Sequence, residues 1–501
     1  MPMRLLVANR GEIAVRIFRA CRDLGIETVA VYSDADRTAL HVTMADYAVR
    51  LGPAPSAESY LSIARILEAA KQTGASLIHP GYGFLAESAE FATACADAGL
   101  TFVGPSPSAI EAMGAKTTSR VLMQSAGVPV VPGTTTPARD AAELAEFARS
   151  AGYPILLKAS AGGGGKGMRR VASEAELAPA FARASAEAQA SFGDGSIYAE
   201  KLLERPRHVE VQIAADQRGH RVAVGERECS IQRRHQKVVE ECPSPAVLPE
   251  VRARLFSAAL AAADAVGYDS CGTVEFLLAE DGSFYFLEMN TRLQVEHPIT
   301  EEVWGVDLVR EMIRAALGEP LSFGAHDLAP RGHAIECRVY AEDPFHGFAP
   351  SPGRVETLRL PEGPGVRNDV GFEQGSVVPF DYDPMLGKLI VRGRDRPAAI
   401  RRLSCALAEY ELTGIDSTLP LFRQLVGDPE FARGEFDVQW LDRKLAAGWL
   451  KPSVAGDDEV LLAAVALAAS AGEAIPVLET AEASRRSSWK DAARREALRR
   501  K

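Results

Sequence analysis

The chain has 501 residues, of which 47% are hydrophobic and 7% aromatic, and its formal net charge is −11. This length and composition predict a globular protein of about three domains, and the acidic balance argues against a nucleic-acid-binding protein. The seven cysteines form no CxxC pair, and the longest apolar run, 460–469, is too short to cross a bilayer and is typical of a buried helix, so we expect no zinc site, no disulfide framework, no membrane span and a cytoplasmic location.

The first region alternates short apolar runs with amphipathic segments. Strands are predicted at 4–8, 27–32, 76–79 and 101–103, and helices at 11–24, 58–72 and 88–98. This βαβ alternation indicates a parallel sheet with helices on both faces, up to about residue 112. Ligands bind such sheets at the carboxyl ends of the strands, where the loops 8–12 and 79–87 are expected.

The second region, from about 113 to 330, lacks this regular alternation. It begins with a helix that holds Lys116, and a second helix is predicted at 139–151. Strands at 154–159, 197–203 and 209–214, together with a hairpin near 273–290, predict one mixed, largely antiparallel sheet.

The third region, 331–445, opens with a predicted strand at 333–340. The tail that follows is rich in alanine and ends in the basic segment 484–501. This segment is interpreted either as a helix that docks on a partner or as a frayed, solvated terminus.

The segment Gly162–Gly167 satisfies the GxGxxG pattern of dinucleotide-binding folds. That pattern must open a helix, whereas residues 168–171 are typical of a returning strand, and the next helix begins near Ser173. A P-loop is excluded because Lys166 is followed by Gly167 rather than by Ser or Thr. The remaining interpretations are a glycine-rich flap whose backbone amides bind phosphates, supported by Lys158 at the end of the preceding strand, and a flexible surface loop.

Residues 273–297 predict a β-hairpin that carries a metal site. The Asp281-Gly282 pair is typical of a two-residue turn, which would place Leu278 opposite Tyr285 and Glu275 opposite Glu288. Two facing carboxylates repel each other, and a divalent cation such as magnesium removes the repulsion. Asn290, two residues beyond Glu288, adds a third oxygen. The alternative is a pair of exposed glutamates on a solvated strand face.

These motifs together resemble the biotin carboxylases of the ATP-grasp superfamily. The resemblance covers residues 1 to about 446 and rests on the segments ANRGEIAVRI, HPGYGFLAE, KASAGGGGKGM, ERECSIQRRHQKVVEE, EMNTRLQVEHP and GHAIECRVYAEDP, which occur in family order. It implies α/β and α+β folds: a parallel βαβ domain at 1–112, an ATP-grasp domain at 113–330 with a mobile glycine-rich lid at about 130–203, a mixed C-terminal domain at 331–446 and a helical tail at 447–501.

The resemblance also implies roles for individual residues. Expected ATP contacts are Lys116, Lys158, Gly162, Gly163, Gly164, Gly165, Glu200, Lys201, Leu203, His208, Gln232 and His235. Bicarbonate is expected to bind Lys237, Arg292, Gln294 and Val295, and Mg²⁺ or Mn²⁺, with two ions expected, to bind Glu275, Glu288 and Asn290. Glu296 resembles the general base, and Arg338 the cation that binds biotin and stabilises its enolate. Lys237 and Arg292 complete the expected catalytic set.

The implied reaction is ATP-dependent carboxylation of biotin by bicarbonate through carboxyphosphate. Because no Ala-Met-Lys-Met sequence occurs in the chain, biotin is expected on a separate carrier protein, with a carboxyltransferase as further partner and a homodimer that uses Arg19 and Asp23. The implied context is the first half-reaction of an acetyl-CoA or other acyl-CoA carboxylase, as in fatty acid biosynthesis. Tyr340, where the bacterial acetyl-CoA carboxylase subunits carry Asn, favours the acyl-CoA carboxylase α-chains.

Other functions remain open at this point. The nearest alternatives are a component of a two-subunit pyruvate-type carboxylase and another ATP-grasp ligase that joins a carboxylate to an amine. A dehydrogenase would rest on the Gly162–Gly167 pattern alone. A catalytically silent scaffold protein is disfavoured by the complete set of site residues.

Overall fold

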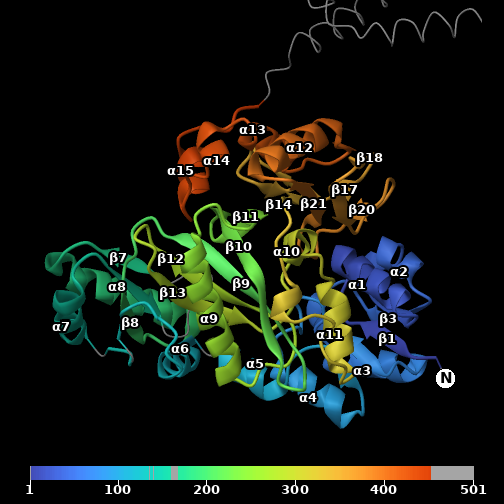
Figure 1. The fold of residues 1–501 in the computed structure, drawn as a ribbon, viewed down its shortest axis with the longest axis horizontal. Helices are drawn as coiled ribbons and strands as arrows, with labels where there is room; N and C mark the ends of the chain where they lie inside the picture. Colours follow the sequence, from blue (N-terminus) through green and yellow to red (C-terminus); the bar gives the residue numbers. More distant parts are fainter. Residues whose placement is uncertain (1, 115, 135, 139, 160–167, 453–501) are drawn as a thin grey trace, which may run out of the picture. The chain divides into compact units, whose positions relative to one another are not determined.

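The computed structural model describes residues 2–114, 116–134, 136–138, 140–159 and 168–452 (Figure 1). Residues up to Leu450 form one unit by their contacts. The glycines 162–165, the apolar run 460–469 and the basic segment 484–501 lie outside the described residues. Within the described ranges, no helix is both long and apolar enough to cross a membrane.

The N-terminal region forms the predicted parallel sheet, with strand order β3-β2-β1-β4-β5. Its strands are β1 (Arg4–Val7), β2 (Glu27–Ser33), β3 (Tyr47–Gly52), β4 (Leu77–His79) and β5 (Thr101–Phe102), and its helices are α1 (Gly11–Asp23), α2 (Leu40–Met44), α3 (Ile63–Thr73) and α4 (Ala89–Asp97). The sequence analysis missed β3 and started α3 too early, because a 3₁₀ turn at Ser56–Glu58 precedes that helix.

The two loops at the carboxyl ends of β1 and β4 meet, as the parallel topology predicts. The Asn9 side-chain amide donates hydrogen bonds to the carbonyl oxygens of Pro80 and Tyr82, both at 2.7 Å. The strand order reverses between these two strands, so the loops 8–12 and 79–87 border one ligand-binding edge.

An eight-stranded antiparallel sheet extends across the second and third regions, in the order β13-β12-β9-β10-β11-β14-β21-β19. Its strands are β9 (Arg207–Ala215), β10 (Arg221–Arg233), β11 (Gln236–Cys242), β12 (Gly272–Leu278), β13 (Phe284–Asn290), β14 (His333–Tyr340), β19 (Val366–Val370) and β21 (Met385–Gly393). Because β14 pairs with β11, side chains on either side of residue 330 share one sheet.

Two helices cover different parts of this sheet (Figure 1). Helix α9 (Pro249–Ala265) buries Leu255 and Ala259 in a core with residues of β9, β12 and β13. Helix α12 (Arg396–Glu409) buries Leu403 and Leu407 with residues of β14 and β21. Both cores immobilise the strands that carry the polar residues discussed below.

The β12–β13 hairpin has the predicted pairing of Glu275 with Glu288, but its turn differs from the prediction. The Ala279 amide donates to the Ser283 carbonyl at 2.8 Å, so the loop has three residues, with Gly282 in the left-handed region at φ 77°. Leu278 therefore faces Phe284 and Phe276 faces Phe286, and a register shift between Phe276 and Glu275 restores the predicted pairing.

Strands β6 (Ile155–Ala159), β7 (Arg169–Val171) and β8 (Ile197–Lys201) form a separate antiparallel sheet in the order β7-β6-β8. The prediction of one mixed sheet was therefore wrong, because α7 (Ala141–Ala151) and α8 (Glu174–Phe192) give these strands a core of their own. The predicted returning strand after the glycines is confirmed as β7, and α8 begins only at Glu174. This strand–loop–strand order excludes the dinucleotide-binding interpretation.

The remaining elements connect or extend these sheets. The helices are α5 (Pro107–Gly114), α6 (Lys116–Ser125), α10 (His297–Trp304), α11 (Leu308–Ala316), α13 (Leu419–Leu425), α14 (Pro429–Arg433) and α15 (Trp440–Ala446). Three two-stranded pairs are β15 (Glu342–Asp343) with β16 (Ala349–Pro350), β17 (Gly353–Arg354) with β20 (Val377–Val378), and β18 (Thr357–Arg359) with β22 (Glu411–Thr413).

Candidate active site

A cavity of about 870 Å³ is lined by residues from all three regions of the chain. Thirteen of the predicted site residues line it: Lys158, Glu200, His208, Gln232, His235, Lys237, Glu275, Glu288, Asn290, Arg292, Gln294, Val295 and Arg338. The N-terminal loops contribute Asn9 and Tyr82, and the segment before β21 contributes Asp381 and Asp383. The sequence prediction therefore located most of the cavity wall.

Several predicted residues lie elsewhere or are not described. The Lys201 ammonium donates to the carbonyl oxygens of Gly152 and Tyr153 at 2.8 and 3.2 Å, and Leu203 follows the end of β8; neither lines the cavity. Lys116 is the first residue of α6, and its side chain is not described. The glycines 162–165 lie outside the described residues.

A tight hairpin turn places Lys237 at the centre of the site. Gln232 pairs with Lys237 and Arg233 with Gln236 across β10 and β11, which leaves Arg234 and His235 as a two-residue loop. Both loop residues have positive φ angles, 49° and 66°, as a type I′ turn requires. Neither is glycine, so this loop holds backbone strain at the edge of the cavity.

Lys237 binds three carboxylates at once. Its Nζ donates to Glu210 Oε2 at 2.5 Å, Glu275 Oε1 at 2.7 Å and Glu296 Oε1 at 2.6 Å. Burial opposes the ammonium charge, but the three carboxylates outweigh it and raise the pKa of Lys237 well above its usual value. The lysine is thus a fixed cation that holds three strands and the start of α10 together.

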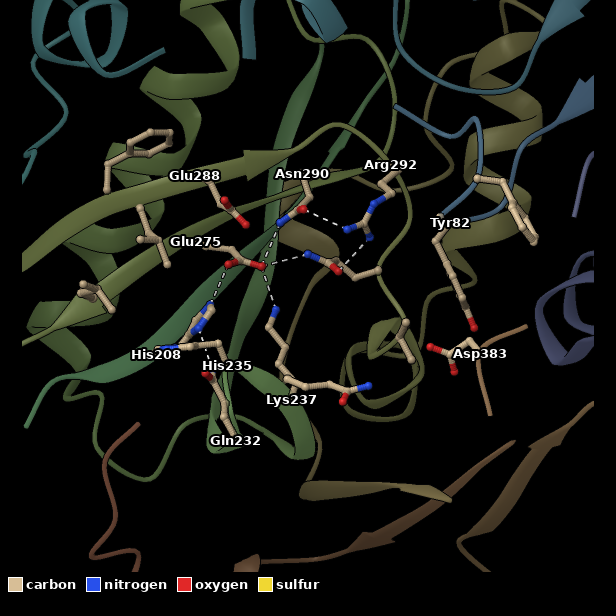
Figure 2. A pocket seen from close by; sticks show the side chains of 18 of the residues that line it. Tyr82, His208, Gln232, His235, Lys237, Glu275, Glu288, Asn290, Arg292 and Asp383 are labelled. Carbon is tan, nitrogen blue, oxygen red and sulfur yellow. Dashed lines mark hydrogen bonds and ion pairs between the residues drawn. The ribbon is translucent and has the colours of Figure 1, made fainter. Parts of the chain in front are cut away.

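Glu275 is the most heavily bonded of these carboxylates (Figure 2). Its Oε1 also accepts from Asn290 Nδ2 at 2.8 Å and Gln294 Nε2 at 3.1 Å, and its Oε2 lies 2.9 Å from His208 Nε2. Burial raises its pKa, but Lys237 and His208 lower it more, so the net pKa lies below the ordinary value. Glu275 is therefore ionised.

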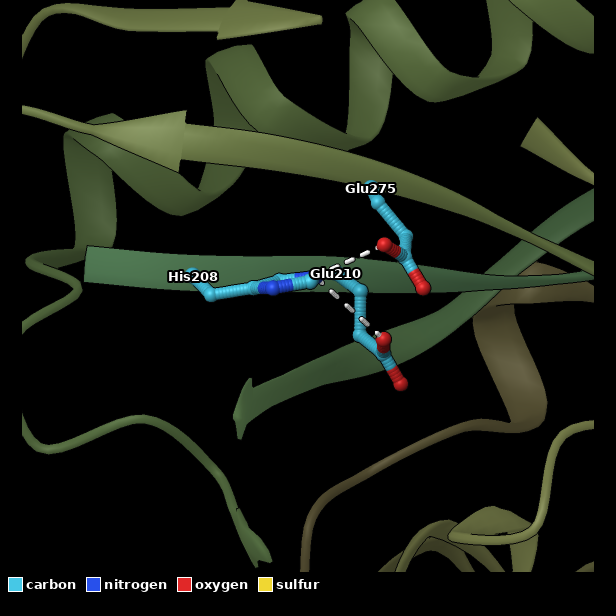
Figure 3. A group of neighbouring side chains, drawn as sticks. All are labelled: His208, Glu210 and Glu275. Carbon is cyan, nitrogen blue, oxygen red and sulfur yellow. Dashed lines mark ion pairs between the residues drawn. The ribbon is translucent and has the colours of Figure 1, made fainter. Parts of the chain in front are cut away.

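The cluster formed by His208, Glu210 and Glu275 has the donor atoms of a metal site, which all lie within 4.8 Å of one another (Figure 3). The charge of Lys237 Nζ already neutralises two of its carboxylates. A divalent cation placed in this cluster would repel the ammonium. The opposite side of Glu275, where Glu288 and Asn290 also line the cavity, is the side open to a cation.

Arg292 lies beside this hairpin end. Its guanidinium donates to Glu87 Oε2 at 2.9 Å, Asn290 Oδ1 at 3.0 Å and Gln294 Oε1 at 3.0 Å. Glu87 comes from the loop after β4, which was predicted to border a ligand site. The backbone at Val295 is fixed because its carbonyl oxygen accepts from Lys388 Nζ at 3.0 Å.

Glu296 joins Lys237 to Arg338. Its Oε2 accepts from Arg338 at 2.9 Å, and Arg338 Nε also donates to Glu240 Oε1 at 2.6 Å. Burial raises the pKa of Glu296, but Lys237 and Arg338 outweigh it and hold the pKa well below its ordinary value. Glu296 is thus a buried carboxylate kept ionised by two cations, and an anion bound beside them would make it a stronger base.

Two charged pairs lie at the β6–β8 end of the cavity. Glu200 binds both Lys158 and Arg120, and Lys158 is the last lysine before the undescribed glycines. Gln232 Nε2 lies 2.8 Å from His208 Nδ1, on the side of the cavity away from Tyr82 and Asp383 (Figure 2). The cavity therefore has a basic end near β6 and a second end near Arg338.

Sequence reasoning missed Glu210 and its partner Arg227. Arg227 is fully buried and donates to Glu210 Oε1 at 2.5 Å, Gln212 at 2.7 Å and Thr300 at 2.9 Å. The signal was present in the sequence, because Glu210 and Gln212 interrupt the otherwise apolar strand 209–214 on one face. Such buried polar groups require partners.

Three family models together match most of the chain. Residues 1–110 match the biotin carboxylase N-terminal domain, 115–323 the ATP-binding domain of the carbamoyl-phosphate synthase L chain, and 336–443 the biotin carboxylase C-terminal domain. The biotin carboxylase of Halalkalibacterium halodurans is 53% identical over 446 residues, which cover 89% of this chain and 98% of that one.

The chain belongs to the biotin carboxylase family. As a biotin carboxylase it is an ATP-grasp ligase. One of the two pyruvate carboxylase subunits of Methanothermobacter thermautotrophicus is also 53% identical, over 443 residues that cover 88% of this chain and 90% of that one. Family membership therefore identifies the biotin-carboxylating half-reaction but not the final acceptor.

A solved structure supports the fold of this biotin carboxylase. The biotin carboxylase domain dimer of the Hydrogenobacter thermophilus 2-oxoglutarate carboxylase, in complex with MgADP, ADP and bicarbonate, is 45% identical. It superimposes with a TM-score of 0.82, and the match covers 89% of this chain and 98% of that one.

Proposed function

We propose that this chain carboxylates biotin carried on a separate protein, with ATP and bicarbonate, and forms carboxyphosphate as the intermediate. The observation that carries the proposal is the convergence of Arg292, Lys237, Glu296 and Arg338 on one cavity. It provides cations for two anionic reactants, a buried ionised base and a delocalised cation for biotin.

ATP is proposed to lie between the β6–β8 sheet and the β12–β13 hairpin. Lys158 at the end of β6 and His208 on β9 line the cavity there and are the proposed phosphate contacts, together with Lys116 and the glycines 162–165. Gln232 and His235 are the proposed ribose-side contacts. Glu200 and the strand end at Lys201 and Leu203 are proposed to border the adenine.

The residues present fit a magnesium ion. Glu275 and Glu288 face each other across the hairpin, and Asn290 lines the same cavity, so hard oxygen donors converge where a hard cation is bound. When bound, magnesium or manganese would neutralise charge on the ATP phosphates. The MgADP complex of the Hydrogenobacter domain supports this assignment.

Bicarbonate is proposed to bind Arg292 through two parallel hydrogen bonds, with Gln294, Lys237 and the backbone of Val295 as further contacts. Glu296 takes the bicarbonate proton, and the resulting oxyanion attacks the γ-phosphorus as the bond to the ADP oxygen breaks. Because bicarbonate shares the charge of Lys237, its binding raises the basicity of Glu296 at the moment when a base is needed.

Carboxyphosphate then gives carbon dioxide and phosphate. The phosphate accepts the proton from the ureido nitrogen of biotin, whose electron pair forms the new bond to carbon dioxide. Arg338 is proposed to bind the ureido oxygen, where negative charge collects, because guanidinium stays charged and delocalised. Arg338 and the base Glu296 are 2.9 Å apart, so both half-steps occur at one place.

The proposed context is the first half-reaction of an acyl-CoA carboxylase, with a carboxyltransferase as partner. Tyr340, the residue behind that choice, lines the cavity and its hydroxyl accepts from Gln236 Nε2 at 3.1 Å. A pyruvate-type carboxylase is the second candidate, favoured by the 53% identical Methanothermobacter protein. A homodimer is proposed from the exposed Arg19 and Asp23 on α1 and the dimer of the Hydrogenobacter domain.

ATP cleavage by the purified chain tests this function directly. With bicarbonate and magnesium present, free biotin should increase the rate, and no increase would contradict the proposal. Purification of the cell's complex through this chain, followed by assays of carboxyl transfer to acetyl-CoA, propionyl-CoA and pyruvate, then identifies the acceptor. Transfer to pyruvate alone would contradict the acyl-CoA assignment and support the second candidate.

A further inference from the structure

The two most exposed large hydrophobic side chains among the described residues are three positions apart. Phe380 is 79% exposed and Val377 is 61% exposed. Scattered exposed hydrophobic residues need no explanation, but two on one short segment form the kind of apolar surface that protein partners bind. Val377 begins β20, and Phe380 follows its end.

This segment leads directly into the active-site cavity. The next residues, Asp381, Tyr382 and Asp383, all line it, and β21 then pairs Met385 with Tyr340 and Lys388 with Arg338 on β14. Phe380 is therefore near the end of the cavity where Arg338 lies. Figure 2 places Asp383 and Tyr82 on the Arg292 side, away from His208 and Gln232.

The segment is held on the N-terminal region rather than extended into solvent. The Tyr382 hydroxyl is hydrogen-bonded to Ser33 Oγ and the Ala54 carbonyl oxygen, both at 2.5 Å. Its ring packs edge-on against Tyr60 with a centroid distance of 5.5 Å, and the Arg10 guanidinium lies 4.4 Å from its centre. Phe380 is thus presented on a preformed support, which lowers the entropy cost of binding a partner.

We propose that Phe380 and Val377 form the docking contact for the protein that carries biotin, an inference that rests on the proposed function. A tethered biotin can reach Arg338 only if the body of its carrier lies at this rim. Exposed aromatic side chains are frequent anchors of protein interfaces. A second copy of this chain bound there would cover the rim instead and exclude the tethered substrate.

The charges beside the apolar pair define the partner further. Asp381 and Asp383 are exposed, so a carrier face with acidic side chains would be repelled. The proposed partner surface is therefore an apolar depression next to the biotin-bearing lysine, bordered by Lys or Arg.

A comparison of tethered and free biotin tests this inference. The carrier is the biotin-bearing protein purified through its biotin from the cells that produce this chain. We expect Phe380→Ser, alone and with Val377→Ser, to lower kcat/KM for the carrier by at least about tenfold, while kcat/KM for free biotin changes less than about twofold. Leu248→Ser is the matched control, because Leu248 is 59% exposed and does not line the cavity.

Each outcome is decisive. Equal activity of Phe380→Ser and the wild-type chain with the carrier would overturn the docking site, and so would parallel losses with carrier and free biotin, or a wild-type chain that uses free biotin but not the carrier. A wild-type chain that responds to neither form contradicts the proposed function itself. Unchanged melting temperatures of the variants show that folding is intact.

Discussion

Substitution of Lys237 by methionine tests the electrostatic centre of the site. Methionine keeps much of the side-chain length but removes the ammonium that binds Glu210, Glu275 and Glu296 at 2.5 to 2.7 Å. None of the three carboxylate residues is more than 3% exposed, so water cannot replace the lost donor. Part of the charge must then be removed by protonation.

The expected size of the effect follows from this geometry. Removal of one partner from a buried ion pair costs about 3–5 kcal/mol of folding stability, and Arg227 and His208 remain beside Glu210 and Glu275 to offset part of it. Loss of one charged donor from the reacting centre lowers kcat by about 10²–10³. Because Lys237 is the strongest cation lowering the pKa of Glu296, the acidic limb of the rate profile should move to higher pH.

The assay is biotin-dependent ATP cleavage from about pH 6 to 9, a range that brackets the operating pH of a general base, together with thermal unfolding. Lys444→Met is the matched control, since Lys444 binds Asp428 at 3.0 Å and does not line the cavity; it should keep wild-type activity. A Lys237→Met enzyme with near wild-type kcat and an unmoved acidic limb would refute the role given to this cluster.

Three further predictions use other parts of the structure. Burial lowers the pKa of His79 to about 3, so the unfolded chain binds a proton below about pH 6.5 that the folded chain does not, and stability falls as the pH decreases from about 6.5 toward 3. Urea unfolding at about pH 7 and 5 should show about 2 kcal/mol less of this loss in His79→Asn, whose carbonyl can accept the Gly81 amide that His79 Nδ1 now accepts at 3.0 Å; an equal loss would contradict the assignment. Gly282→Val puts a β-branched residue at φ 77°, costs about 1–3 kcal/mol and should raise the apparent Michaelis constants for ATP and bicarbonate together, whereas unchanged constants would separate the hairpin from substrate binding. Arg338→Lys keeps the charge but cannot bond Glu240 and Glu296 through one planar group, so it should reduce biotin-stimulated ATP cleavage by at least about tenfold; full activity would remove Arg338 from the biotin step.

The sequence predicted those parts of the fold that depend on local patterns. The alternation in residues 1–112 predicted four of the five parallel strands, and the Asp281-Gly282 pair located the hairpin. Its turn length was wrong, yet Glu275 still faces Glu288, because the register shift offsets the extra loop residue. Local patterns fix which strands pair more reliably than they fix the register near a turn.

The contacts between distant residues were less predictable. Lys237, Glu210 and Glu296 come from three elements, and nothing in their local sequence shows that one ammonium binds both carboxylates. The separate β6–β8 sheet was missed for the same reason, since a strand pattern does not specify its sheet. The resemblance supplied most of the cavity residues, but it gave no indication of Phe380.

The central claim is that Glu296 is the base that starts the reaction at bicarbonate. Its most direct test is the rate of biotin-stimulated ATP cleavage by Glu296→Gln, which keeps the shape of a side chain that is 0% exposed but cannot take a proton. We predict a loss of at least about 10², with ATP binding measured by calorimetry little changed. A variant that retains the wild-type rate would contradict the account.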